Sequence, residues 1–137
     1  MEVFVSYDEL HDYIGRHYDK DVSFAKAGEQ EIRVTLVQSL LVVNKKISED
    51  LHIDSVSEDS VSVSYKGGLV KGLVISAAIG YIRGKSADLN EAMTTEDGNR
   101  VNICLSKIEK LRSALDKIEL RAISVEEAGI RITLALK

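Results

Sequence analysis

The chain has 137 residues and a net charge of −4, so it is long enough for one domain with a core of its own. Its basic residues are scattered, with Lys45-Lys46 as the only adjacent pair, which argues against a nucleic-acid-binding surface. The single cysteine, Cys104, excludes an intramolecular disulfide and a cysteine-rich zinc site.

The first ten residues, MEVFVSYDEL, include an early acidic residue and no sustained apolar run, so they contain no recognisable secretory leader. As the chain stands, this pattern favours the cytoplasm. A leader removed ahead of this methionine would instead place the protein in the cell envelope. The compartment therefore stays open between these two.

A capping box predicts the first helix. The Ser6 side chain can accept a hydrogen bond from the amide of Glu9, while Glu9 reaches back to the Ser6 amide. Leu10 and Ile14 then fall on one face, with charged residues opposite. We expect an amphipathic helix that runs to about Tyr18.

Alternating apolar and polar residues predict antiparallel strands between residues 22 and 65. A short strand at Val22–Phe24 is followed by a turn at 27–30. The strand-like region from 31 to 53 is longer than usual strands, so we expect a break near Gln38-Ser39 or within 44–49. A hairpin over 54–65 ends in a strand with one apolar face and a row of serines, typical of a solvated sheet face.

The most apolar stretch is GGLVKGLVISAAIGYIRG, residues 67–84, which predicts a helix at 69–82. About 14 helical residues span roughly 21 Å, too short for the ~30 Å hydrocarbon core of a membrane. Gly72, Ser76 and Gly80 form a stripe of small side chains that allows another backbone to approach closely. The helix either lies across the sheet as a core element or lines an apolar pocket with one flank.

Polar residues dominate 85–100, which we interpret as a mobile surface loop without a calcium-binding pattern. A short strand is expected at 100–105. A second capping box, Ser106 to Glu109, predicts an amphipathic helix whose apolar stripe contains Ile108, Leu111, Leu115 and Ile118.

The chain is predicted to close with a hairpin of two strands, 120–125 and 130–136. The apolar parity shifts between Leu120 and Ile123, which indicates a bulge in the first strand or a strand covered on both faces. This order of elements predicts a single α+β domain over residues 1–137. We expect a strongly curved antiparallel sheet packed around the apolar helix, together with two amphipathic helices.

No residue pattern points to catalysis or to a cofactor. The candidate acid–base or metal-binding residues are His11, His17 and His52, and the first two are six apart, so they point in different directions. Metal motifs, a nucleophile elbow and a complete phosphate loop are absent. Cys104 lies in the apolar run VNICL and is expected to be a small buried side chain.

The layout resembles the single-domain bacterial members of the tubular lipid-binding (TULIP) superfamily. The resemblance is carried by the capped helix followed by DVSFAKAGEQEIRVTL, by the apolar segment GLVKGLVISAAIGYI and by NRVNICLSKIEKLRSALDKIELRAISVEEAGIRITLAL. It implies a long, curved sheet wrapped around a helix, an apolar cleft for acyl chains and no catalysis. The cleft is expected to be lined by Leu69, Leu73, Ala77 and Tyr81, facing Leu111 and Leu115. A leader or lipid anchor, common in such proteins, is not recognisable here.

Three hypotheses follow. The first is non-enzymatic binding of a lipid or other apolar ligand beside helix 69–82, without a cofactor. The second is a structural or protein–protein interaction module that forms a homodimer through the same helix and holds no ligand. The third is an enzyme of cystatin-like or cone-shaped α+β form, with His52 or an acidic residue in its mouth.

Overall fold

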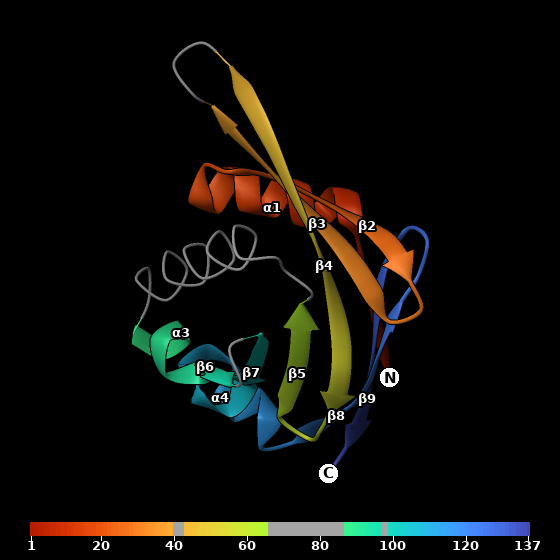
Figure 1. Cartoon of the computed structure of the whole chain (residues 1–137). Helices are drawn as coiled ribbons and strands as arrows, with labels where there is room; N and C mark the ends of the chain where they lie inside the picture. Colours follow the sequence, from red (N-terminus) through yellow and green to blue (C-terminus); the bar gives the residue numbers. More distant parts are fainter. Residues whose placement is uncertain (40–42, 66–86, 97–98) are drawn as a thin grey trace.

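The computed structural model describes residues 1–39, 43–65, 87–96 and 99–137 (Figure 1). These residues form two antiparallel sheets with helices beside them, which confirms the predicted α+β class. In chain order the elements are β1 (Glu2–Ser6), α1 (Tyr7–Tyr18), β2 (Asp21–Gly28), β3 (Glu31–Ser39), β4 (Asn44–Val56), β5 (Ser60–Tyr65), α3 (Ala87–Ala92), β6 (Met93–Glu96), β7 (Arg100–Cys104), the 3-10 helix η1 (Leu105–Lys107), α4 (Glu109–Leu115), β8 (Ile118–Val125) and β9 (Gly129–Leu136).

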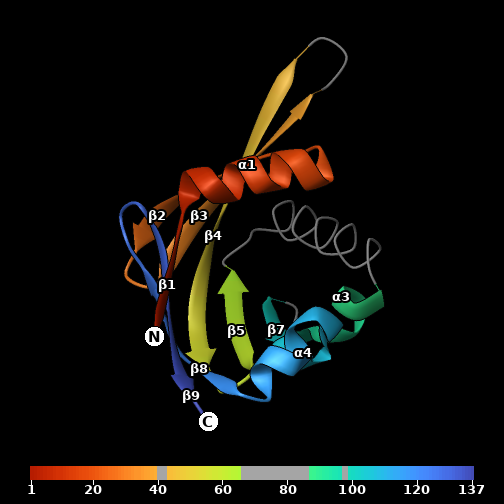
Figure 2. The ribbon, with the colours of Figure 1, turned by 180° about the vertical axis from the view of Figure 1, so that it is seen from behind.

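Helix α1 begins and ends at local signals in the sequence. The Ser6 hydroxyl accepts from the Glu9 amide at 3.1 Å, and the Ser6 amide donates to the Glu9 carboxylate at 3.2 Å, so the predicted capping box is confirmed. The helix ends at Tyr18 because Asp19 adopts a left-handed conformation, with φ of 53°. Figure 2 shows the chain entering α1 directly from β1.

The larger sheet has six antiparallel strands in the order β2-β3-β4-β5-β7-β6. The long region from 31 to 53 is a hairpin of β3 and β4. One expected break, near Gln38-Ser39, agrees with the end of β3. The alternative position for the break, within 44–49, is wrong: those residues pair with Val34–Ser39 and belong to β4, where pairing with β3 holds even the polar run 44–46 in a strand.

Strand alternation gives the larger sheet one apolar and one polar face. Most cross-strand pairs place like residues side by side; the exceptions on the apolar face are Lys26 opposite Ile32, Glu49 opposite Val34 and Thr95 opposite Val101. The apolar face carries Val22, Phe24, Ile32, Val34, Leu36, Ile47, Leu51, Ile53, Val61, Val63, Tyr65, Val101, Ile103 and Met93. The polar face carries Glu31, Arg33, Thr35, Ser48, Asp50, His52, Ser62, Ser64, Arg100, Asn102 and Thr94. The predicted solvated row of serines lies on this polar face.

The smaller sheet has the order β1-β9-β8. Its register shifts between Leu120 and Ala122, which confirms the predicted bulge. Two turns of the larger sheet bond to β8, an edge strand of the smaller sheet. In the first turn, the Gln30 side-chain amide donates to Ile123 O at 2.7 Å and accepts from Val125 N at 3.3 Å. Glu58 O accepts from Leu120 N at 2.8 Å in the same way. These bonds fix the smaller sheet against the ends of the larger one.

A buried cluster of Tyr7, Ile32 and Val125 joins the two sheets and α1. Leu10, Phe24, Leu51, Ile53 and Ile130 pack around it. The Tyr7 hydroxyl donates to Glu126 O at 2.5 Å, and the Tyr7 amide donates to Ala128 O at 3.1 Å. The start of α1 is therefore tied to the β8–β9 turn by both backbone and side chain.

Two local predictions in the second half of the chain are wrong. The expected surface loop at 85–100 contains α3 and β6, and Ala92 between them is only 1% exposed. The polar composition of this segment gave no sign of a strand. Strand β6 is held by pairing with β7, which places Met93 beside Ile103 on the apolar face. Tertiary pairing overrides the weak local preference for a strand here.

The expected capping box at Ser106 is also wrong. Ser106 lies inside η1, and α4 begins at Glu109 after Ile108, which makes no side-chain capping bond. The Ser106 hydroxyl instead contacts the Cys104 sulfur at 3.2 Å. Helix α4 ends at Leu115, so Ile118, expected on the helical stripe, starts β8.

Candidate functional site

The predicted apolar cleft is described only on its α4 side. Leu69, Leu73, Ala77 and Tyr81 lie outside the described residues, as does the small-residue stripe of Gly72, Ser76 and Gly80. On α4, Leu115 is buried whereas Leu111, one turn earlier, is 39% exposed. Leu111 is therefore an apolar side chain on a short helix that can still be covered by a ligand or partner.

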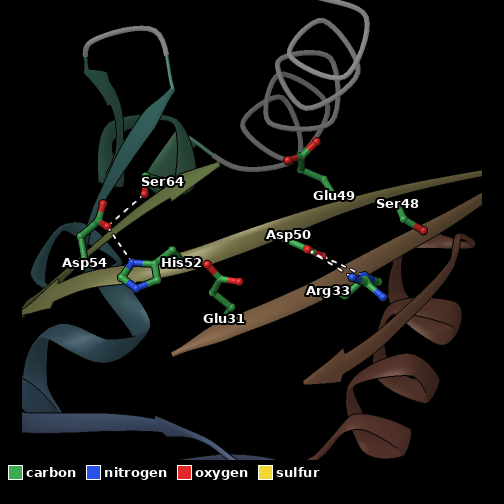
Figure 3. A pocket seen from close by; sticks show the side chains of 8 residues that line it. All are labelled: Glu31, Arg33, Ser48, Glu49, Asp50, His52, Asp54 and Ser64. Carbon is green, nitrogen blue, oxygen red and sulfur yellow. Dashed lines mark hydrogen bonds and ion pairs between the residues drawn. The ribbon is translucent and has the colours of Figure 1, made fainter. Parts of the chain in front are cut away.

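A pocket of about 710 Å³ lies over the start of β3, the middle of β4 and the end of β5 (Figure 3). It is lined by Glu31, Arg33, Ser48, Glu49, Asp50, His52, Asp54 and Ser64. All of these except Glu49 belong to the polar face of the larger sheet; Glu49 pairs with Val34 on the apolar face and is 4% exposed. The pocket is thus a polar feature with more carboxylates than cations.

His52, Asp54 and Ser64 form a connected group at one side of this pocket (Figure 3). The His52 Nδ1 donates to an Asp54 carboxylate oxygen at 2.9 Å, and the Ser64 hydroxyl donates to the same oxygen at 3.0 Å. The Arg100 guanidinium lies 3.5 Å from the other Asp54 oxygen. The bulge between Ile53 and Ser55 brings Asp54 to this position beside Ser64.

The hydrogen bond from His52 is the main reason that the pKa of Asp54 lies below its ordinary value. The Ser64 hydroxyl and the Arg100 charge act in the same direction, and partial burial acts against them. Because Nδ1 donates to Asp54, the neutral imidazole carries its lone pair on Nε2. This arrangement can orient a general base, with the His52 side chain 44% exposed to solvent.

On the other side of the pocket, Arg33 and Asp50 pair across β3 and β4. Arg33 donates to both Asp50 oxygens, at 2.9 and 3.3 Å. Two residues further along each strand, the Thr35 and Ser48 hydroxyls lie 2.9 Å apart. These contacts follow directly from the register of β3 and β4. They link the side chains of the polar face into a network at the surface.

The remaining candidate residues have structural roles. His11 Nδ1 donates to Val22 O at 2.8 Å, which ties α1 to β2, and the His17 ring lies 4.3 Å from the Tyr13 ring. Cys104 is half-buried and contacts Ser106, so the expectation of a simple buried hydrophobe is wrong. Within the described residues, no group of three or more His, Cys, Asp and Glu side chains is placed to hold a metal ion.

None of the helices in the described ranges has the length and apolarity needed to cross a membrane. Comparisons of this chain with protein-family models, with curated proteins and with solved structures found no match.

Sequence reasoning did not assemble the pocket around His52. The alternation of Glu31 with Arg33, and of Asp50 with His52, was a visible signal of one polar sheet face. The missing information was the register between β3, β4 and β5, which sets His52 opposite both Glu31 and Ser64.

Proposed function

We propose that this protein binds a lipid or another apolar ligand, without catalysis, in a cleft beside helix 69–82. In this proposal the six-stranded sheet curves around that helix, as the TULIP resemblance implies. The cleft is lined by Leu69, Leu73, Ala77 and Tyr81 from the helix and by Leu111 and Leu115 from α4.

The observation that carries the proposal is the breadth of the apolar face on the larger sheet. It extends over all six strands, yet many of its side chains stay only half-buried, among them Val34, Leu36 and Ile47. Helix α1 packs chiefly against β2, and α3 packs against η1 and, to a smaller extent, against β6 and β7. The central strands thus present apolar surface that favours a further apolar layer, which helix 69–82 and a ligand would supply together.

Leu111 supports the same proposal from the other side. An exposed leucine on a short helix next to a buried Leu115 is the arrangement expected of a cleft wall. Burying a fully exposed leucine contributes on the order of 1.5–3 kcal/mol of hydrophobic free energy, and Leu111 is 39% exposed. A bound acyl chain would gain part of this amount.

Mass spectrometry after organic extraction of the purified protein tests the proposal. We expect acyl chains in the extract of the wild type and clearly less in that of Leu111→Asp. Ser113→Asp, an equal charge change at another exposed α4 position, should keep the wild-type level. An extract free of apolar ligand would contradict the proposal. A ligand-free dimer that Leu73→Asp makes monomeric would favour an interaction module instead.

A second candidate function rests on the His52–Asp54 hydrogen bond in the polar pocket. A histidine oriented by a carboxylate is a common general base, and it would act in an enzyme of the cone-shaped α+β kind. Turnover on a panel of polar substrates, lost in His52→Ala and kept in His17→Ala, would support this alternative. Equal rates in both variants would remove it.

A further inference from the structure

We propose that the outer edge of β1 pairs antiparallel with β1 of a second copy of this chain. The two smaller sheets then join into one continuous sheet of six strands. A twofold axis passes through Val3, so the same residues meet on both sides. This interface uses none of the residues proposed to line the ligand cleft.

Backbone geometry shows which groups of β1 face outward. Met1 and Leu134 exchange hydrogen bonds at 2.9 and 2.8 Å, and Tyr7 N donates to Ala128 O at 3.1 Å. Hydrogen-bonded pairs alternate along an antiparallel ladder, so Val3 and Val5 also turn their N–H and C=O groups toward β9. The backbone groups of Glu2 and Phe4 consequently point to the other edge of β1, which pairs with no strand among the described residues.

The capping box ends the set of outward backbone groups at the C-terminal end of β1. The Ser6 amide, which would be the next outward donor, already donates to the Glu9 carboxylate at 3.2 Å. Glu2 and Phe4 therefore provide the complete outward set of paired N–H and C=O groups within β1.

This outward set is self-complementary. With Val3 on the axis, Glu2 of each chain lies opposite Phe4 of the other, and each such pair exchanges two backbone hydrogen bonds. The pairing leaves the bonds of β1 to β9 and the capping box intact. The two Val3 side chains meet as a non-hydrogen-bonded pair, the closest type of cross-strand pair.

The side chains along β1 suit this pairing on both faces of the sheet. Val3 is 45% exposed and continues the apolar row of Ile132, so it gains cover from the second Val3. On the other face, Arg131 lies 5.0 Å from the centre of the Phe4 ring and 3.4 Å from Glu2. Glu2 of the second chain would lie beside Phe4, where its charge complements that of Arg131.

The opposite edge of the same sheet is already used within the chain. Gln30 and Glu58 bond to the backbone of β8 at three points, Leu120, Ile123 and Val125. The edge strand β2 of the larger sheet likewise receives His11 at Val22 O. On β1, by contrast, the described residues place no strand against the outward groups of Glu2 and Phe4, which could therefore pair with a second strand.

Pairing of one short strand buries less than the roughly 1,200–2,000 Å² of a standard interface. We therefore expect a weak dimer, with a Kd on the order of 10–100 µM. Sedimentation velocity from about 10 µM to about 1 mM should show a concentration-dependent shift from monomer to dimer. Protein that stays monomeric throughout this range would overturn the proposal.

Two substitutions test whether the dimer interface lies on β1. Phe4→Pro removes an outward N–H but none that bonds to β9, a position where an edge strand tolerates proline. Val3→Lys sets two like charges opposite each other on the axis. Each should raise the Kd at least about tenfold. Leu136→Lys, an equal change at a 74% exposed residue of β9 beyond the end of β1, should leave the Kd unchanged.

Disulfide trapping tests the register, and because the bond is covalent it accumulates even a weak dimer. In a Cys104→Ser background, Val3→Cys would bring two thiols together at a Cα separation of about 4.5 Å, within the range for a disulfide. It should form a covalent dimer rapidly on mild oxidation, whereas Phe4→Cys should not. Equal trapping at both positions, or a dimer lost only in Leu73→Asp, would refute β1 pairing.

Discussion

The two faces of the six-stranded sheet are built from the same strands but are stabilised by different interactions. On the polar face, Arg33 meets Asp50 and His52 meets Asp54 in direct contacts between neighbouring side chains. On the apolar face, Val101 is 3% exposed and Val61 is 8% exposed, and no charge pairing is needed to hold them. The ion pairs of the polar face therefore contribute less to stability than the buried side chains of the apolar face, because exposed ion pairs are worth little.

The largest effect should come from placing a charge on the apolar face. Val101→Asp buries an unpaired carboxylate and should lower the free energy of unfolding by more than about 3 kcal/mol. Asn102→Asp, the next residue of β7 on the polar face, should change it by less than about 0.5 kcal/mol. Urea denaturation followed by circular dichroism measures both. Similar losses in the two variants would mean that the faces are not distinct.

The junction where the apolar core continues into the smaller sheet should be the next most sensitive. Gln30→Asn keeps an amide and tolerates the φ of 56°, but its shorter side chain cannot reach both Ile123 and Val125. We expect a loss of about 1–2 kcal/mol from the unpaired backbone groups. Glu29→Ala in the same turn is the control, and a loss of similar size there would show that the turn, not the bridge, matters.

A smaller effect is expected on the polar face at Asp54. Asp54→Asn keeps the shape of the side chain but weakens the contacts with His52 and Arg100, and should cost under about 1 kcal/mol. The same urea denaturation measures this loss. A cost as large as that of Val101→Asp would reverse the ranking of the two faces.

The pH dependence of Asp54 gives the finest test of the polar face. Its folded pKa lies below the ordinary value of 3.8, so its contribution to stability is present above that value. The contribution is lost as the pH falls through the folded pKa. NMR titration should show the Asp54 pKa rising toward 3.8 in His52→Ala, since the main cause of the lowering is removed. An unchanged pKa would mean that Ser64 and Arg100 suffice.

Several elements could be predicted because their signals are local. The Ser6–Glu9 capping box and the apolar parity shift near Leu120 involve residues close in sequence, and both are confirmed. The strand β6 was missed because Met93 is in a strand through its pairing with Ile103, which no local pattern shows. The expected capping box at Ser106 failed for a local reason, since Ser106 lies inside η1 and its hydroxyl contacts Cys104. That residues 1–137 form one domain, and that Leu69, Leu73, Ala77 and Tyr81 line a cleft, stay predictions.

By itself the sequence determined the α+β class, most of the antiparallel strands and which residues of those strands share a face, because the period of a strand is a property of its backbone. The tertiary structure alone decided the register, the placement of the smaller sheet and the grouping of His52 with Asp54 and Ser64. Those features depend on backbone groups far apart in the chain, such as Gln30 with Ile123, whose pairing no local pattern encodes. Which edge of β1 faces away from the sheet is likewise set only by its pairing with β9.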